Sequence, residues 1–356
     1  MKIKTFIITT KKISAISGHG GSQCANRNFL AFCNYFNASN ITIFNLYECY
    51  TKSKILKRIN FLFFRWFGLD KNNERVILNK IADADLVFIE DSRYGRISKI
   101  IKQKYPLKKI IVFFHNSEYE YIKQEHSHNL IRQHIVKKNE EWACKYSDKI
   151  VVLNKRDKSV IQKLYGRVAD AVIPISFSNK QIEFNKNEIS YPPTALFLGS
   201  NFFANIHGIK WFIEKVLPFV KIKLKIVGKN MDKANLPKND KLEIIGYIES
   251  LDDCMQNADF IVLPIFKGSG MKVKTCEALM HGKNIIGTQE AFQGYDVDFE
   301  KVGACCETAE EFIKAINEFP SRFNRKYNEY SRSKFLEKYS NDVTFRQFAK
   351  MFEELE

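Results

Sequence analysis

The strongest constraint on the fold is one stretch in the second half of the chain, which reads as strand, glycine turn, helix, helix stop and second strand. Residues 260–265 form a continuous apolar run, as expected of a strand buried on both faces of a parallel sheet. A Gly-Ser-Gly turn follows at 268–270, and residues 271–281 have a helical period. Gly282 stands where helices end in the left-handed conformation, and 284–287 resumes the sheet. This pattern predicts a doubly wound α/β fold.

The turn of this stretch is a candidate binding site for an anion. Free backbone N–H groups and the positive end of the helix both favour an oxyanion there. Gly270, Lys274 and Glu277 share one face at i, i+4 and i+7 spacing, so Glu277 points back toward the turn. Its carboxylate can accept both hydroxyls of a ribose while the turn amides hold an attached diphosphate. The alternative is an ordinary Lys274–Glu277 ion pair on a solvated helix face.

Similar strand-helix units occur along the whole chain. With 356 residues the chain exceeds a usual single core, so two domains are expected. We predict a first Rossmann-like domain over 1–176, a polar linker over 177–193 that ends in Tyr-Pro-Pro, and a second Rossmann-like domain over 194–335. The strands that we expect lie at 3–9, 41–46, 84–89, 110–114, 149–153 and 172–175, then at 195–198, 224–227, 242–245, 260–265 and 284–287.

Two features of the first half are candidates for contact with a substrate. Gly20 and Gly21 lie in a loop between the first strand and a helix, although glycines in a tight turn need no ligand. His115 follows the apolar run 110–114, at the rim where parallel sheets meet their ligands. It is either a group that polarises a reacting sugar or a rim histidine with a structural hydrogen bond.

The charge of the chain favours an anionic partner. Lys and Arg number 56 against 40 Asp and Glu, a net charge of +16, which suits nucleic acid, a phospholipid surface or a phosphorylated substrate. Residues 51–67 combine lysines and arginines with large apolar residues at helical spacing. This is typical of a basic amphipathic helix that lies on an anionic bilayer. The alternative is a helix whose apolar face packs on its own sheet.

The cysteines and the hydropathy pattern indicate a cytoplasmic protein. Eight cysteines occur without a C-x-x-C pair, so we interpret them as reduced core residues and expect neither disulfides nor a metal site. The N-terminal residues 1–10 are too short and too charged for a signal peptide, and no segment reaches the length of a membrane span. The protein is therefore expected in the cytoplasm, either soluble or peripheral on the inner face of the membrane.

The order of these segments resembles the GT-B glycosyltransferases, and among them glycosyltransferase family 4 of the surface-polysaccharide type. The resemblance covers nearly the whole chain and is most specific over 268–288. It implies two Rossmann-like domains that face a central cleft, with a C-terminal helix at 336–356 that packs on the first domain. The residues that carry it are Gly20-Gly21, His115, V-V-L-N-K-R-D-K (151–158), L-F-L-G-S-N-F-F-A-N-I-H-G-I-K-W-F (196–212), I-V-G (226–228), A-D-F-I-V-L-P (258–264) and G-S-G-M-K-V-K-T-C-E-A-L-M-H-G-K-N-I-I-G-T (268–288).

The resemblance also implies a reaction. The protein would move a sugar from a nucleotide diphosphate sugar to a growing bacterial surface glycan, such as capsule or lipopolysaccharide, or to a lipid-linked acceptor. Retention of configuration is expected, with no metal and no other cofactor. Catalytic roles fall to His115 and Glu277, and Gly20 and Gly21 line the acceptor side. The donor would be bound by Gly199, Ser200, Gly246, Tyr247, Gly268, Ser269, Gly270, Met271, Lys272, Lys274 and Glu277.

One departure from the family pattern concerns the donor sugar. Many relatives carry a second glutamate eight positions before the one at Glu277, and this chain has Ser269 there. The paired basic clamp of other members is also missing, with Lys210 as a stand-in. The group that binds the donor sugar and the stereochemical outcome therefore stay open. Alternative functions are a nucleotide-sugar 2-epimerase of the same fold, a basic nucleic-acid-binding protein and a catalytically silent GT-B scaffold.

Overall fold

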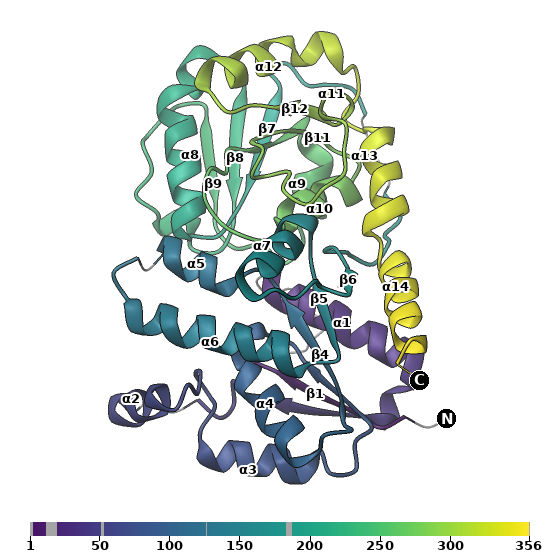
Figure 1. Ribbon diagram of the computed structural model, residues 1–356. Coiled ribbons are helices and arrows are strands. Elements are labelled where there is room, and N and C mark those ends of the chain that lie inside the picture. The colour runs from purple at the N-terminus through teal and green to yellow at the C-terminus, as the bar shows by residue number, and fades with distance from the viewer. Residues whose placement is uncertain (1–2, 12–19, 51–52, 126, 183–186, 356) are drawn as a thin grey trace. The chain divides into compact units, whose positions relative to one another are not determined.

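The structure is a computed structural model that divides into two compact units (Figure 1). The first unit comprises Met1–Pro174 with Thr344–Glu356, and the second comprises Ile175–Val343. The described residues are 3–11, 20–50, 53–125, 127–182 and 187–355.

The first unit is built on a six-stranded parallel sheet in the order β2-β1-β3-β4-β5-β6. Strands β3 and β4 are the apolar runs at its centre, and they are buried because helices cover both faces. The sheet grows in opposite directions from β1, so the carboxyl ends of β1 and β3 flank the point of reversal where such folds bind ligands. The strands are β1 Thr5–Thr9, β2 Ile41–Asn45, β3 Leu86–Ile89, β4 Lys109–Phe114, β5 Lys149–Val152 and β6 Ala171–Val172.

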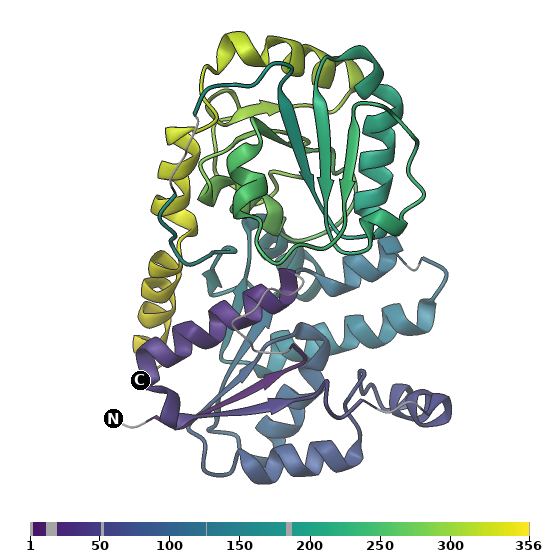
Figure 2. The same ribbon diagram turned by 180° about the vertical axis from the view of Figure 1, so that it is seen from behind.

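The helices of this unit include one from the far end of the chain. Figure 2 shows α1 across one face of the sheet with α14 beside it. The rings of Phe32 and Phe352 from these two helices lie 4.7 Å apart, in an aromatic cluster. The helices are α1 Gly20–Phe36, α2 Lys54–Leu62, α3 Lys71–Lys80, α4 Gly95–Lys104, α5 Glu118–Glu125, α6 Leu130–Tyr146, α7 Lys155–Tyr165 and α14 Asn341–Glu353.

The second unit repeats the doubly wound plan, with the strand order β12-β11-β10-β7-β8-β9. The point of reversal lies between β7 and β10. Gly282 has φ +58° after helix α10, which confirms the predicted left-handed helix stop. The strands are β7 Thr194–Leu198, β8 Lys223–Val227, β9 Leu242–Ile245, β10 Phe260–Leu263, β11 Asn284–Gly287 and β12 Gly303–Cys305. The helices are α8 Phe203–Lys215, α9 Asp252–Asn257, α10 Val273–Met280, α11 Phe299–Val302, α12 Ala309–Arg322 and α13 Glu329–Lys334.

The segment expected as a linker is tied to the second unit by hydrogen bonds. The Phe177 amide donates to Tyr339 at 3.1 Å, and the Phe177 carbonyl accepts from Asn341 at 2.8 Å. The buried Asp259 carboxylate accepts from the Ser190 amide at 3.0 Å. The C-terminal helix expected at 336–356 is divided into a π-helical turn at Phe335–Tyr339 and α14.

The helix expected over 51–67 is shorter than predicted. It ends at Leu62, and Thr51 and Lys52 lie outside the described residues. Arg65 is buried, and its Nε and Nη2 each donate to the Glu74 carboxylate at 2.9 Å. Trp66 is buried in the core. The expectation that both lie on an amphipathic surface helix is therefore wrong, because Arg65 finds its counter-ion on α3.

Helix α2 itself lies at the outside of its unit, away from the sheet (Figure 1). None of its residues is buried, and Ile55 and Leu62 are 71% and 77% exposed. The part of the chain that the structure describes contains no helix that is both long enough and apolar enough to cross a membrane.

Candidate functional site

Each unit carries polar groups at the carboxyl ends of its strands, and we call these two places the polar edges. The first polar edge contains the turn between β10 and α10. Gly268 and Gly270 have φ of +132° and +62°, conformations that a side chain would strain. Helix α10 begins at Val273, two residues later than expected, because Lys272 is extended with φ −91° and ψ 111°. The turn is therefore longer than the sequence predicted, and Met271 and Lys272 are part of it.

The side chain of Lys272 stabilises this turn by hydrogen bonds to its carbonyl groups. Its Nζ lies 2.7 Å from Oε1 of Glu290 and donates to the carbonyls of Ser269 and Gly270 at 3.3 and 3.0 Å. The hydroxyl of Tyr295 donates to the Lys272 carbonyl at 2.7 Å. These bonds hold the glycine turn in one conformation before any ligand binds, which reduces the entropy cost of binding.

Lys274 is the second cation at this edge, and its hydrogen-bond partner is uncharged. Its Nζ donates to Oδ1 of Asn205 at 2.6 Å and lies 5.0 Å from the centre of the Phe197 ring. Burial and the nearby Lys272 together lower the pKa of Lys274 to about 7, although Glu277 opposes the shift. An anion at this edge would restore the charged form of Lys274.

Glu277 lies on α10 one turn after Lys274 and is half-buried. The interpretation of these two residues as a pair on a solvated face does not fit Lys274, because its ammonium group is desolvated and bonded to Asn205. The role of Glu277 toward a ribose stays a prediction.

The other predicted donor residues lie at the carboxyl ends of neighbouring strands. Gly199 and Ser200 follow β7, and Gly246 and Tyr247 follow β9. Gly228, which follows β8, connects the two loops: its amide donates to the Gly246 carbonyl at 3.2 Å. A Cβ atom at Gly228 would lie 1.9 Å from the Gly199 carbonyl oxygen. Only glycine allows this approach of the backbones, so the three loops meet at one edge of the sheet.

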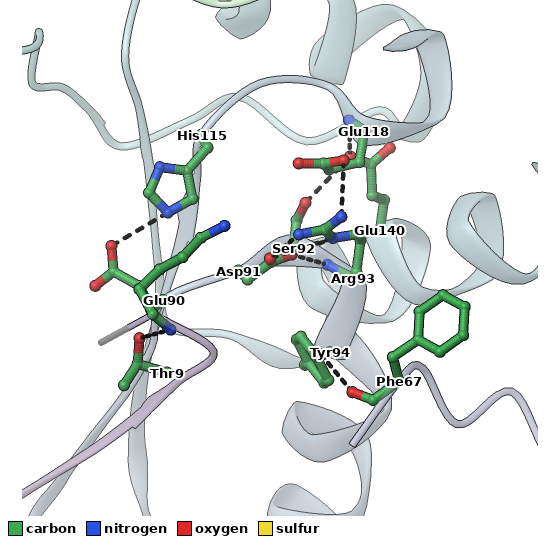
Figure 3. Close-up of polar contacts among 11 residues, drawn as sticks. Thr9, Phe67, Glu90, Asp91, Ser92, Arg93, Tyr94, His115, Glu118 and Glu140 are labelled. Atoms are coloured by element: carbon green, nitrogen blue, oxygen red, sulfur yellow. Dashed lines mark hydrogen bonds and ion pairs between the residues drawn. The ribbon is translucent and has the colours of Figure 1, made fainter. Parts of the chain in front are cut away.

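The second polar edge belongs to the first unit and is centred on His115, just after β4 (Figure 3). Its Nε2 lies 3.2 Å from Oε1 of Glu90, which follows the neighbouring strand β3. The same oxygen accepts from Nδ2 of Asn28 at 2.9 Å. Burial disfavours the charged ring, but hydrogen bonds with Cys24 and Glu90 raise the pKa of His115 to about 10. The ring is therefore an imidazolium at neutral pH.

A network of buried charges continues from this edge (Figure 3). Nε of Arg93 donates to Oδ1 of Asp91 at 2.9 Å, and its Nη1 lies 3.5 Å from Oε2 of Glu118. Burial opposes the charge of Asp91, but Arg93 lowers its pKa to about 2. The buried Glu140 carboxylate accepts from the Glu118 amide at 2.8 Å and from the Tyr165 hydroxyl at 2.7 Å. Within the described ranges, no group of three His, Cys, Asp or Glu side chains is arranged to hold a metal ion.

The glycines predicted on the acceptor side open helix α1. Gly20 is its first residue, and the preceding residues 12–19 lie outside the described residues. A Cβ atom at Gly21 would lie 3.2 Å from Cε of Lys11, so the absence of a side chain leaves room for that lysine.

The structure thus sorts the predicted site residues into two sets, one at the carboxyl edge of each sheet. Sequence reasoning missed Asn205, Glu90 and Cys24, which contact the predicted residues. A signal for Glu90 was present, because it directly follows an apolar strand as His115 does. No local signal marks Cys24, which reaches His115 from a helix.

Comparison with known proteins gives a family match and a fold. Residues 192–320 match the model of the family described as glycosyl transferases group 1. No curated protein matches the sequence significantly. The recognition of a glycosyltransferase is therefore confirmed by a family match over residues 192–320 of the second unit.

Solved structures of the same fold cover nearly the whole chain at low identity. Sucrose-phosphate synthase from Thermosynechococcus elongatus is 13% identical with a TM-score of 0.76, covering 99% of both chains. Anabaena HepE in complex with UDP is 10% identical with a TM-score of 0.68, covering 99% of this chain and 100% of that one. The lipopolysaccharide outer core galactosyltransferase WaaB is 14% identical with a TM-score of 0.67, covering 98% and 99%. These similarities confirm the predicted fold class of two doubly wound parallel sheets.

Proposed function

We propose that this chain, a GT-B protein whose residues 192–320 form a glycosyl transferases group 1 domain, transfers a sugar from a nucleotide diphosphate sugar to a growing glycan. The observation that carries the proposal is the braced glycine turn after β10, beside the desolvated ammonium group of Lys274. Backbone amides and a cation without an anionic hydrogen-bond partner suit a diphosphate.

Each residue of the two edges has a role in this proposal. Glu277 accepts the ribose hydroxyls, while residues 268–272 and Lys274 bind the diphosphate. Gly199 and Ser200 line the donor site, and Gly246 and Tyr247 border the base. In the first unit, His115 faces the reacting sugar, and Gly20 and Gly21 line the acceptor side. The charge of the leaving diphosphate is stabilised by protein groups, so we expect no metal and no other cofactor, and retention of configuration.

The acceptor that we propose is a bacterial surface glycan or a lipid-linked precursor, on the cytoplasmic side of the membrane. Support comes from one protein with the same fold, a lipopolysaccharide outer core galactosyltransferase, and from the UDP bound by another. The net charge of +16 suits an acceptor that carries phosphate or lies at an anionic surface.

Helix α2 is the surface that we assign to the membrane. It carries three basic residues and no acidic one, and its exposed apolar side chains include Ile55, Ile59 and Leu62. Apolar insertion and attraction to anionic lipid act together on such a helix. Trp66 is excluded from this role because it is buried.

Vesicle flotation tests the membrane assignment. Wild-type protein should float with vesicles of phosphatidylglycerol and phosphatidylcholine, and Ile55→Ser/Leu62→Ser should reduce the bound fraction about tenfold, because two exposed apolar anchors are lost. The matched control is Leu130→Ser/Ile131→Ser, an equally exposed apolar pair on α6. Equal flotation of the two double variants would remove α2 from the membrane surface.

Calorimetric titration and a transfer assay test the donor assignment. A panel of nucleotide sugars should yield one that binds and is hydrolysed or transferred. Glu277→Ala should weaken its binding about 10- to 100-fold, the effect of losing charged hydrogen bonds to a ribose. Glu214→Ala is the control, since Glu214 is an exposed residue of α8 in the same unit. Undiminished binding by Glu277→Ala would remove that residue from the site, and salt-dependent binding of RNA or DNA without any nucleotide-sugar binding would replace the proposal.

A further inference from the structure

The His115 ring has a sulfur neighbour that the proposed reaction does not use. Cys24 lies in the second turn of α1, 4% exposed, and its Sγ accepts from Nη2 of Arg27 at 3.1 Å. Arg27 is 2% exposed and is fixed by a second bond, from Nη1 to the Pro174 carbonyl at 2.7 Å. A buried guanidinium held in place against sulfur favours the thiolate over the thiol.

The ring of His115 is hydrogen-bonded to the sulfur of Cys24 and pairs with the carboxylate of Glu90. Glu90 lies 3.2 Å from Nε2 and is anchored by Asn28. The two groups come from different elements, α1 and the end of β3, so the ring is held in one orientation. Both groups are anions when His115 is charged, and both therefore favour the imidazolium.

We propose that Cys24 is a positioning residue for His115: together with Glu90 it holds the ring as an oriented imidazolium, so that the reaction at neutral pH uses a cationic hydrogen-bond donor there and not a neutral base. The proposal rests on the proposed function only in placing His115 at the reacting sugar. The only covalent change is a proton transfer: the S–H bond of Cys24 breaks, an N–H bond of the His115 ring forms, and no group is lost.

The surrounding charges agree with this assignment. Burial raises the pKa of the Cys24 thiol, but Arg27 and the hydrogen bond from His115 outweigh it, and the net shift is downward. Asp91 is paired with Arg93 and also has a favourable charge interaction with His115. The charged and titratable groups that face this cluster are Cys24 and Arg27 of α1, Lys11 after β1, Glu90 and Asp91 after β3, Arg93 of the turn that follows, and Glu118 of α5.

Nuclear magnetic resonance of the full chain with labelled histidine tests the proposal directly. The signal of His115 is assigned by its loss in His115→Asn, and its pH titration is followed in the wild type and in Cys24→Ser. We expect the wild-type ring to stay protonated beyond pH 8, and the ring in Cys24→Ser to titrate at least about one pH unit lower. Cys33→Ser, a change of the half-buried cysteine on the same helix, is the control. A wild-type ring that titrates near pH 6.5, or an unchanged titration in Cys24→Ser, would overturn the proposal.

A second measurement covers the case in which Cys24→Ser folds poorly. The ultraviolet absorbance of thiolates is titrated in the wild type, in Cys33→Ser and in Glu90→Gln. The last variant keeps Cys24 and changes the group on the other side of the His115 ring. One thiolate should be present at neutral pH in the wild type and the control, and Glu90→Gln should keep it while lowering the His115 titration. Appearance of thiolate only near the ordinary cysteine range, above about pH 8, would contradict the proposal.

The pH profile of kcat separates this inference from the proposed function. In Cys24→Ser, the alkaline fall of kcat should begin at a lower pH than in the wild type, by the same shift as the His115 titration, since a less basic ring loses its proton earlier. If no nucleotide sugar supports activity, the proposed function fails while the two titrations still decide the role of Cys24.

Discussion

The two polar edges of this protein lie at equivalent places in two doubly wound sheets, yet they treat charge differently. In the first unit two buried anions have cationic partners: Asp91 faces Arg93, and Glu90 faces His115. In the second unit Lys272 is paired with Glu290, but the ammonium group of Lys274 is bonded to a neutral amide.

This difference indicates what each edge is suited to bind. An edge whose charged side chains are already paired with one another can form hydrogen bonds to a ligand and orient it, which suits an uncharged sugar. An edge with a desolvated cation gains electrostatic energy when an anion arrives, which suits a diphosphate. Removing one charge from each edge tests this difference.

The largest effect is expected from Asp91→Asn in the first unit. The change leaves Arg93 buried with only Glu118 near it, at 3.5 Å, so the free energy of unfolding should fall by about 3 kcal/mol. Urea denaturation at neutral pH measures it. Glu141→Gln, which disrupts an exposed pair with Lys138, should cost under about 0.5 kcal/mol. Equal costs for both variants would show that the first edge is not a compensated network.

Lys274→Met, unlike Asp91→Asn, should change ligand affinity more than stability. Stability should change by less than about 1 kcal/mol, because a desolvated ammonium group is replaced by an apolar side chain of similar length. Affinity for UDP should fall about tenfold, as for the loss of one charge-assisted contact to phosphate. Lys215→Met, at an exposed position in the last turn of α8, is the control for net charge. Unchanged UDP affinity in Lys274→Met would place the diphosphate elsewhere.

The smallest effect is the pH dependence of UDP binding. Lys274 has a pKa of about 7 in the free protein, and a bound diphosphate raises it toward the usual value. Binding therefore takes up a proton, and affinity that is present below pH 7 is progressively lost as the pH rises above it. Calorimetry should show affinity several-fold weaker at pH 9 than at pH 7, and this dependence should disappear in Lys274→Met. Equal pH dependence in the variant would assign the proton to another group.

Much of the fold followed from local patterns in the sequence. Strand β11 was predicted to the residue and α10 to within two, because an apolar run between glycines has few alternatives. Helices α3 and α4 were not predicted, although Ile97 and Ile101 of α4 stand at helical spacing and are buried. The helix over 51–67 was extended too far because no periodicity shows that Arg65 pairs with Glu74.

The candidate site was predictable only where it is contiguous in sequence. The donor turn and Glu277 lie within ten residues, so one motif contains them. The surroundings of His115 depend on the placement of β3 beside β4 and on the way α1 crosses the sheet, which no single segment encodes. Glu90 and Cys24 therefore became visible as its neighbours only in three dimensions.

The inclusion of Thr344–Glu356 in the first unit has a consequence for biogenesis. A ribosome completes every residue of the second unit before it makes the segment that covers Phe32 with Phe352. The half that begins to emerge first is thus finished last, and until then its aromatic cluster stays uncovered, within reach of chaperones.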